Sequence, residues 1–345
     1  MRKILCICLV LPLLACSCAK SGAVPSGKKD DTLAQFSRIL QEQNLNRESR
    51  YTAIHGIAES YLAAKDYYNL ILFLTETVEK DPGDMYNAYW LLMTAYAYME
   101  TGALPFAEYY FERVIETCGD LLIGDRSAHF LCLQNLIKIS GNHQNRISYF
   151  NQLISRFPEE VNRTELYYRL ATEYEQVGEW DAALKSYTLF LDQPDSPAIQ
   201  IPGATDAYNH AKRLIDFNNS ARDWTFESLE ALETAVKNAI TNYSYISLDR
   251  YRAKVGFFAM SWKQDATDPN SQANFSLRDF MQGNRIRYHT ELDESSNPNE
   301  AYLRTWGWSQ YISVWYLYFR KVNFPVDPDI HGRWEWAGIY YGEKL

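Results

Sequence analysis

The part of this 345-residue chain whose residue types could most readily do chemistry is a short acidic segment near its C-terminus. Asp327, Asp329 and His331 lie close together around Pro328, and Glu335 follows four residues after the histidine. Carboxylate oxygens and an imidazole nitrogen are ligands for divalent cations, so this spacing could form a metal site. Asp and Pro are also ordinary turn residues. We favour a solvated turn between two strands and predict no metal site.

The remaining sequence contains no recognisable catalytic motif. It has no nucleophile elbow, HExxH, Walker loop, dinucleotide-binding glycine pattern or paired Cys-His unit. The other histidines lack a partnering motif and are expected at the surface or at helix flanks: His55, His129, His143, His210 and His289. We therefore predict that the chain is not an enzyme and uses no cofactor.

The N-terminus has the layout of an export signal. Arg2 and Lys3 precede an apolar stretch, residues 4–15. This stretch is shorter than the ~20 residues that a membrane-spanning helix needs, which indicates a signal peptide. It ends in Leu-Leu-Ala followed by Cys16, which resembles the lipobox of bacterial lipoproteins. The resemblance implies cleavage before Cys16 and lipidation of its thiol; an ordinary cysteine-rich signal peptide is the alternative.

Several acyl chains together would hold such a protein stably on a membrane. Ser17, and no Asp, follows Cys16, so we expect the periplasmic face of the outer membrane. Residues 16–31 would form the lipidated cysteine and a flexible tether. Cys118 and Cys132 are expected to be buried free thiols, with a disulfide between them as the alternative. The net charge of −9 argues against nucleic-acid binding, which needs a basic surface.

The middle of the chain repeats a pattern of two amphipathic helices joined by a turn. Residues 165–194 form the clearest copy, in which Gly178 marks the turn and Pro194 the end. Apolar residues at helical spacing line one face of each helix: Tyr167, Leu170, Ala171 and Tyr174 in the first, and Ala183, Tyr187 and Phe190 in the second.

This pattern resembles the tetratricopeptide repeat. That family places small residues where the two helices cross, as Ala171 and Ala183 would do here. It also places bulky residues in the neighbouring crevices, as Tyr174 and Tyr187 would do. The resemblance implies a stack of helical hairpins, because one hairpin cannot bury its apolar face alone.

Three weaker copies precede this one, and the four copies begin near residues 51, 88, 127 and 164. These starts lie slightly farther apart than the family's period of about 34 residues. The first copy has Lys65 in place of a turn glycine and Leu70 in place of a small residue. The third has Gln134 and Arg146 at its small-residue positions. A generic helical bundle is the alternative.

Helices are expected on both sides of these copies. Residues 33–45 would form a leading helix, and residues 204–217 a solvating helix that closes the stack.

The composition changes after Ser220, and seven of the nine Trp lie beyond it. Residues 226–243 have helical spacing, whereas residues 285–290, 306–319 and 334–341 alternate as strands do. A helix followed by antiparallel strands indicates a compact α+β domain. The run 306–319 has aromatic residues at both parities, so we expect either a second layer, for example the repeat domain, or a partner to cover the sheet's second face.

The predicted fold class is therefore mainly α, a tetratricopeptide-like solenoid followed by a small aromatic-rich α+β domain. The chain would comprise a signal peptide (1–15), the lipidated cysteine and tether (16–31), the repeat domain (32–220) and the α+β domain (221–345).

The family resemblance also implies a partner-binding groove along the first helix of each hairpin. Projecting that register selects the following side chains: His55, Glu59, Tyr89, Leu92, Tyr96, Met99, Asn135, Lys138, Tyr168, Thr172 and Glu175. The set lacks the repeated Lys and Asn that some members use to hold a C-terminal carboxylate. Its apolar area in the second copy suits an amphipathic helix or an extended peptide. Packing of these tyrosines between repeats is the alternative.

These patterns together predict a lipid-anchored periplasmic scaffold that binds partner proteins through its repeats. Lipoproteins similar to this chain assist outer-membrane protein assembly or accompany solute transporters, and the resemblance implies such a role in kind. The competing hypothesis is a periplasmic small-molecule or glycan binder that uses the aromatic C-terminal domain. An enzyme acting on the cell wall ranks third, because an acid/base pair is missing.

The anchor can be tested directly. We expect Cys16→Ser to yield an unlipidated protein that leaves the membrane fraction, because no other segment approaches the ~20 apolar residues of a span. Fractionation of cells followed by immunodetection measures this. Persistent membrane association of the variant, in the absence of a membrane-bound partner, would contradict the anchor.

Overall fold

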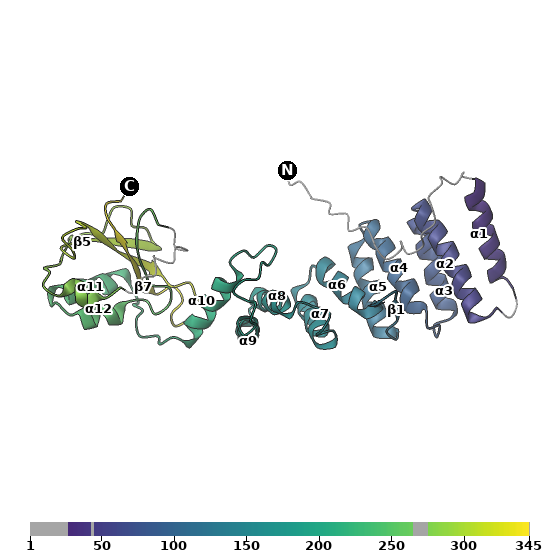
Figure 1. Cartoon of the computed structure of the whole chain (residues 1–345), viewed down its shortest axis with the longest axis horizontal. Helices are drawn as coiled ribbons and strands as arrows, with labels where there is room; N and C mark the ends of the chain where they lie inside the picture. The colour runs from purple at the N-terminus through teal and green to yellow at the C-terminus, as the bar shows by residue number, and fades with distance from the viewer. Residues whose placement is uncertain (1–26, 43–44, 265–274, 345) are drawn as a thin grey trace. The chain divides into compact units, whose positions relative to one another are not determined.

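The computed structural model describes residues 27–42, 45–264 and 275–344 and divides into two compact units, residues 1–166 and 167–345 (Figure 1). The first unit contains helices α1–α7 and the short hairpin β1–β2, whereas α9–α13 and β3–β7 belong to the second. Helix α8 begins in the first unit and continues into the second. This division differs from the domain boundary at 220/221 that the composition suggests.

Successive helices of the first unit pack against each other from α1 to α7. Helix α1 begins and ends earlier than the predicted leading helix at residues 33–45. The elements of this unit are α1 Gly27–Leu40, α2 Arg47–Ala64, α3 Tyr67–Lys80, α4 Asn87–Glu100, α5 Leu104–Thr117, β1 Leu122–Ile123, β2 Arg126–Ser127, α6 Ala128–Ile139 and α7 His143–Arg156.

The first hairpin forms because its caps satisfy the free ends of both helices. Asn46 Oδ1 accepts the Ser49 N–H at 2.8 Å at the start of α2. Asp66 Oδ1 does the same for the Asn69 N–H at 3.2 Å at the start of α3. Between them Lys65 adopts φ = 56°, the left-handed conformation in which a helix usually ends at glycine. The turn therefore forms without the expected glycine.

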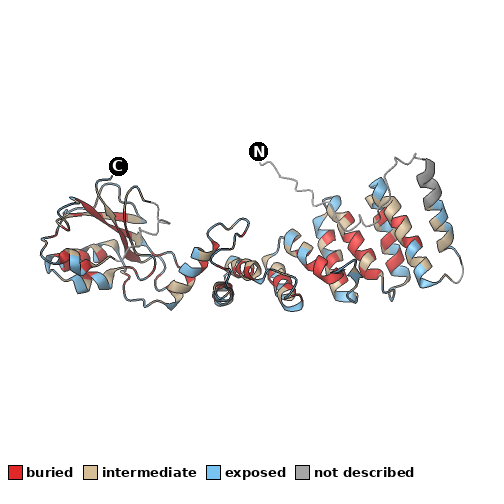
Figure 2. Cartoon of the chain, viewed as in Figure 1, coloured by how far each residue is buried: buried red, intermediate tan, exposed pale blue. Residues whose placement is uncertain are grey.

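Small side chains lie fully buried where the helices cross. Ala58, Ala95 and Ala107 are each 0% exposed, as the tetratricopeptide-like pattern requires. Leu70 is also 0% exposed, so the first hairpin accommodates a larger residue at this position. In Figure 2 the helical ribbons of this unit are coloured as buried mainly where helices face one another and as exposed mainly on their outer sides.

The register predicted for α6 requires a correction. Gln134 is exposed rather than buried at a helix crossing. Cys132, two residues earlier, is 0% exposed instead. A polar amide would lose its hydrogen bonds to water in that position, whereas a thiol behaves as a small apolar group.

The second unit contains the last helical hairpin, α8–α9, followed by α10 and the α+β domain. Its elements are α8 Arg163–Gln176, α9 Trp180–Leu191, α10 Ala207–Asn219, α11 Leu229–Thr241, α12 Tyr245–Tyr251, β3 Phe258–Ser261, α13 Leu277–Met281, β4 Arg287–Tyr288, β5 Glu300–Trp306, β6 Trp315–Lys321 and β7 Trp334–Tyr341. The sheet has the strand order β3-β7-β6-β5-β4. Among these described strands, only β3 and β7 pair in parallel. The predicted fold class, helical hairpins followed by a small sheet domain, is confirmed.

The alternating run at 306–319 is two strands rather than one. Strand β5 ends at Trp306 and β6 begins at Trp315. Gly307, the first residue after β5, has φ = 85°. A Cβ atom at this position would lie 2.4 Å from the carbonyl oxygen of Arg285. Only glycine fits both conditions, so the chain turns here.

Both faces of β6 are buried, as its aromatic residues at both parities suggest. Trp315, Leu317 and Phe319 join one cluster with side chains of α11 and α12. On the opposite face, the Trp262 ring lies parallel to Tyr340 with centroids 4.1 Å apart, and also contacts Tyr302 and Tyr316. Aromatic side chains of the same domain thus pack on this second face.

Helix α10 packs on the last hairpin with one side, as the predicted closing helix would, but the sheet domain packs against it as well. Its Leu214 and Phe217 share a cluster with α8, α9 and residues of the sheet domain. Phe217 stacks on Phe324 with centroids 5.4 Å apart, and Trp224 belongs to the same cluster. The last repeat hairpin therefore shares a core with the α+β domain, which explains the division at 166/167.

This shared core predicts a specific loss of stability. Phe324 is 0% exposed, and Phe324→Ala should lower the free energy of unfolding of the second unit by about 3–5 kcal/mol. Urea denaturation measures the loss, and hydrogen exchange should become faster in the amides of α10. Tyr311→Ala, at a side chain 97% exposed, is the matched control. Unchanged exchange in α10 would show that repeats and sheet domain fold separately at 220/221.

Candidate functional site

The groove residues predicted on α2 and α4 come together at the seam between these helices. His55 and Glu59 lie one turn apart on α2, with His55 Nε2 3.8 Å from Glu59 Oε1. The His55 ring stacks on Tyr89 of α4, with centroids 5.9 Å apart and an interplanar angle of 16°. Burial, followed by the nearby Tyr51 and Glu59, raises the pKa of Tyr89 well above its ordinary value. The phenol therefore stays neutral. Part of the ring packs inside the helix stack, and part of it remains at the surface.

Further along α4 the predicted groove becomes core. Leu92 is only 3% exposed, and Tyr96 and Met99 pack against the same cluster. The Tyr96 hydroxyl accepts a hydrogen bond from Asn135 Nδ2 of α6 at 3.0 Å. Lys138, one turn beyond Asn135, is exposed. Groove positions of the second and third copies are therefore in contact through Tyr96 and Asn135, and Leu92 beside them is buried.

The predicted positions in the second unit are similarly engaged. Tyr168 is 7% exposed and packs edge-on against Tyr187, with centroids 5.7 Å apart. The Tyr187 hydroxyl donates to Glu175 Oε2 at 2.6 Å, and Thr172 Oγ1 donates to the backbone of its own helix. Leu92 and Tyr168 are thus corrections to the predicted groove, because buried side chains leave a partner nothing to contact. The other positions stay a prediction.

The acidic segment before β7 forms a structural turn. Asp327 pairs with Arg222, and its Oδ1 accepts the Asp329 N–H at 2.9 Å. His331 Nδ1 accepts the Phe324 N–H at 3.1 Å. Glu335 lies fully buried on β7. Asp327 and His331 therefore already accept hydrogen bonds within the segment, and the described residues hold no cluster of three potential metal ligands.

His129 lies at the start of α6, a helix flank as expected, but it is buried rather than exposed at the surface. It is 6% exposed, its Nε2 lies 3.0 Å from the Cys118 carbonyl oxygen, and its backbone N–H donates to Asp120 Oδ1 at 3.1 Å. These bonds attach the end of α5 and the loop that follows it to the start of α6. Cys118 and Cys132 are both free thiols, and burial raises the pKa of Cys132. A thiol that stays protonated is a poor nucleophile.

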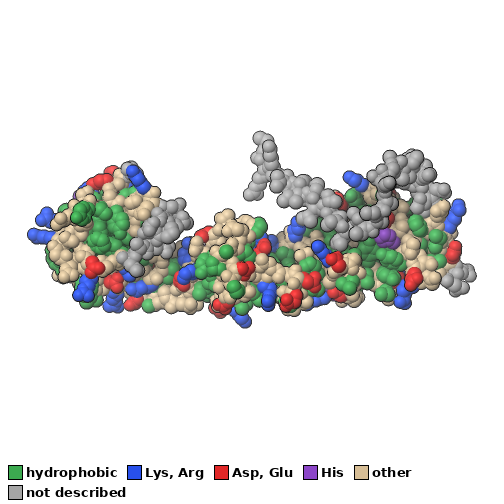
Figure 3. Space-filling model, in the orientation of Figure 1, with side chains coloured by type: hydrophobic (Ala, Val, Ile, Leu, Met, Phe, Trp, Pro, Cys, Tyr) green, Lys and Arg blue, Asp and Glu red, His purple; other side chains and the backbone are tan. Residues whose placement is uncertain are grey.

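An exposed apolar surface that the sequence analysis missed lies on the second helices of the first two hairpins. Five large side chains on α3 and α5 are between 41% and 72% exposed: Tyr68, Leu72, Leu104, Phe106 and Tyr109. We call these five residues the α3–α5 surface. Figure 3 shows hydrophobic side chains gathered over the hairpins of the first unit among scattered charges. The signal was present as apolar residues outside the core stripe of each helix.

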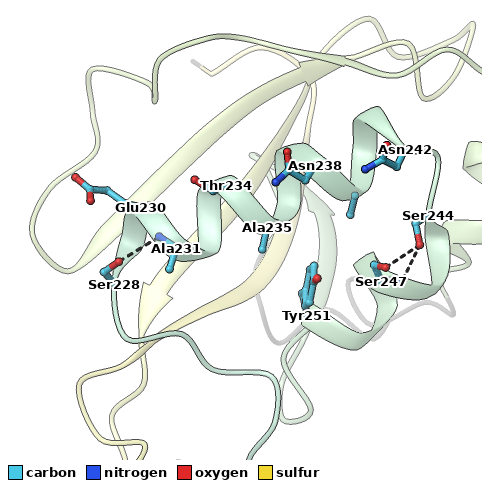
Figure 4. Close-up of a pocket in the computed structure, with 11 residues that line it drawn as sticks. Ser228, Glu230, Ala231, Thr234, Ala235, Asn238, Asn242, Ser244, Ser247 and Tyr251 are labelled. Carbon is cyan, nitrogen blue, oxygen red and sulfur yellow. Dashed lines mark hydrogen bonds between the residues drawn. The ribbon is translucent and has the colours of Figure 1, made fainter.

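A groove of about 760 Å³ lies between α11 and α12 (Figure 4). Short polar side chains line most of it, among them Thr234, Asn238 and Ser247, and Tyr251 is its single aromatic group. Ser228 and Ser244 lie in the groove but are used as helix caps, accepting from Ala231 and Ser247. Its only ionisable carboxylate is Glu230, so the groove contains no acid/base pair.

Cys16 and the remainder of the predicted signal peptide and tether lie outside the described residues. Within the residues that the structure does describe, none of the helices is both long and apolar enough to cross a membrane.

The comparisons with known proteins concern the helical hairpins. No protein-family model and no curated protein matches the chain. The solved tetratricopeptide-like repeats of a kinesin light chain from Podosopora anserina match with 16% identity and a TM-score of 0.34, covering 50% of this chain and 90% of that one. A single-substitution variant of the same repeats matches with 17% identity and a TM-score of 0.33, covering 48% and 85%. Likeness at this level concerns the fold alone.

The packing of Tyr89 and Tyr96 predicts that removing both rings destabilises the first unit. Both rings contact the core of the first unit, so Tyr89→Ala with Tyr96→Ala should lower its free energy of unfolding by about 2–4 kcal/mol in total. Thermal denaturation followed by circular dichroism measures this. Tyr68→Ala with Tyr109→Ala, at exposed rings, provides the control. Equal melting temperatures for both double variants would show that Tyr89 and Tyr96 line an open groove and contribute little to the core.

Proposed function

We propose that this protein is a lipid-anchored scaffold that binds a partner protein through the α3–α5 surface. The observation that supports this most directly is the exposure of five large apolar side chains on two neighbouring helices. Water contact of such groups is unfavourable, and large apolar side chains exposed together on a surface mark interaction sites.

An ion pair between α3 and α5 and ring stacking of α5 on α4 hold the helices of this surface in place. Arg113 Nη2 on α5 lies 3.3 Å from Glu79 Oε1 on α3. At the other end of α5, Phe106 stacks on Tyr98 of α4 with centroids 5.2 Å apart, and Tyr98 stacks in turn on Tyr110 at 5.4 Å. Aromatic rings that are already fixed lose little conformational entropy when a partner binds. The surface is therefore preorganised for binding.

Charges around the surface indicate the chemistry of the partner. Carboxylates on the same two helices flank the apolar groups: Glu76, Glu79, Glu112 and Glu116. Glu76 and Glu79 pair with Lys80 and Arg113, so Glu112 and Glu116 carry the negative charge without an ion-pair partner among the described residues. The whole chain is acidic as well, with a net charge of −9. A partner segment with two or three apolar anchors and basic flanking residues complements this arrangement. An amphipathic helix is the simplest such segment.

The membrane location is supported by the sequence around Cys16. Lipidation of this cysteine would place the helical hairpins near a membrane surface through the tether at residues 16–31. Ser17 at the following position favours the outer membrane, and its periplasmic face is the proposed site. A scaffold at that surface suits envelope assembly or service to a transporter, and neither role needs a catalytic step.

The glycan-binder alternative is less well supported by the geometry of the aromatic sheet face. Trp262 and Tyr340 stack on each other, so each covers a ring face that a sugar would need. The Tyr318 and Tyr302 hydroxyls donate to the Glu300 carboxylate at 2.9 and 3.4 Å. Burial, followed by Glu300, raises the pKa of Tyr302 to about 12. The aromatic rings therefore already stack on each other, and the hydroxyls already donate hydrogen bonds to Glu300.

Site-specific photo-crosslinking in intact cells tests the scaffold. A photoreactive amino acid at Leu72 or Phe106 should give the same discrete crosslinked protein, because both positions belong to one surface. Leu72→Glu with Phe106→Glu should abolish stable co-purification of that protein from detergent-solubilised membranes, while helical content stays unchanged.

The matched control places the photoreactive group at Tyr311 and Ile246, which are 97% and 68% exposed in the second unit. The same crosslinked protein from the control positions, or unimpaired co-purification by the double glutamate variant, would exclude the α3–α5 surface as the binding site.

A further inference from the structure

A pocket of about 370 Å³ lies within the second unit, where the last helical hairpin and α10 meet the sheet domain. Three separate parts of the chain line it: Glu175 and Trp180 from the α8–α9 turn, Arg213 and Phe217 from α10, and Arg320 and Lys321 from the end of β6. The stacking of Phe217 on Phe324 joins α10 to the sheet domain beside this pocket. These walls are therefore fixed by the shared core.

A buried carboxylate orients one of the cations in this pocket. Glu335 is 0% exposed, and its Oε2 accepts from Trp224 Nε1 at 2.9 Å. Its Oε1 accepts from Arg320 Nε, also at 2.9 Å. A carboxylate can be buried only when such bonds replace water. The bond to Nε holds the guanidinium of Arg320 in place, and within the described part of the chain its terminal nitrogens make no hydrogen bond.

Two further cations line the pocket without a carboxylate partner. Arg213 and Lys321 are exposed, and neither forms an ion pair with any residue that the structure describes. Lys321 Nζ lies 5.8 Å from the centre of the Trp334 ring. An aromatic ring carries no net negative charge, so this contact does not neutralise the lysine as a carboxylate would. Burial lowers the pKa of His210, which also lines the pocket, so the imidazole adds no charge at neutral pH.

Glu175 is the one carboxylate among the described lining residues that offsets these two cations. It accepts the Tyr187 hydroxyl at 2.6 Å, and Glu335 is already neutralised by Arg320. Positive charge therefore exceeds negative charge in the pocket, although the chain as a whole is acidic. Trp180, Leu214 and Phe217 add apolar area to the same walls.

From this arrangement we infer that the pocket binds a small organic carboxylate with an apolar tail. The carboxylate would pair with Arg320, Arg213 and Lys321, because a guanidinium matches the geometry of two carboxylate oxygens. The tail would lie against Trp180 and Phe217. The volume falls at the lower end of the range for ligand pockets, which suits a molecule with one ring. Glu175 disfavours a dianion such as phosphate, since it adds a like charge.

Calorimetric titration of the full chain with 3-phenylpropanoate tests this inference at low ionic strength. The acid should bind with a Kd below about 1 mM, the weak end of specific binding. Its uncharged amide, 3-phenylpropanamide, should bind at least tenfold more weakly. Arg213→Gln with Lys321→Gln should raise the Kd of the acid at least tenfold. Both side chains are exposed, so the double variant should fold normally.

Lys185→Gln with Arg278→Gln removes two exposed cations of the same unit away from the pocket and should leave the Kd unchanged. Equal affinity for acid and amide would overturn the inference, as would inorganic phosphate binding as tightly as the acid. An unchanged Kd in the Arg213 and Lys321 variant would exclude this pocket as the binding site. None of these outcomes depends on the scaffold function or on the α3–α5 surface.

Discussion

A helical hairpin has an apolar face that it cannot cover by itself, and the architecture of the whole chain follows from this constraint. In the first unit each helix covers the next, with Ala58, Ala95 and Ala107 allowing close approach where they cross. The same constraint continues past the last hairpin, because α9 and α10 also need cover. Phe324 and Trp224 supply it from the other side, so the sheet domain takes the place of a further repeat. A tail domain that caps a stack in this way becomes part of the stack's own core.

Local sequence patterns were sufficient for the helical hairpins. Alanines at crossing positions, helix-ending turns and apolar spacing are visible within about 30 residues. The predicted starts near 51, 88 and 164 lie inside the first helices observed, and residue 127 directly precedes α6. The sequence-based predictions were wrong at positions where contacts between distant segments determine the structure. Cys132 instead of Gln134 is buried because the neighbouring helices admit a thiol there. The break in the run 306–319 depends on the close approach of Gly307 to Arg285, which no local pattern shows.

The candidate sites were harder to predict than the fold, because exposure is a property of the assembled helices. A helical face can be read from spacing, yet spacing does not tell whether another helix covers it. Leu92 and Tyr168 lie on the expected faces and are nevertheless buried. Leu72 and Phe106 are exposed. They lie on second helices, whereas the family resemblance predicted a groove along the first helices. The cationic pocket had no sequence signal at all, since its residues come from three distant segments.

The two surfaces differ in the sign of their charge, and the range of electrostatic interaction explains how one chain can have both. The net charge of −9 attracts a basic partner at a distance and so reinforces the acidic flanks of the α3–α5 surface. The same net charge repels an anion, but salt screens exposed charges beyond about 8 Å at physiological ionic strength. Within that distance the pocket presents Arg213, Lys321 and a guanidinium fixed by Glu335. Capture of an anion there therefore depends on the lining groups, whereas partner association depends also on the charge of the whole chain.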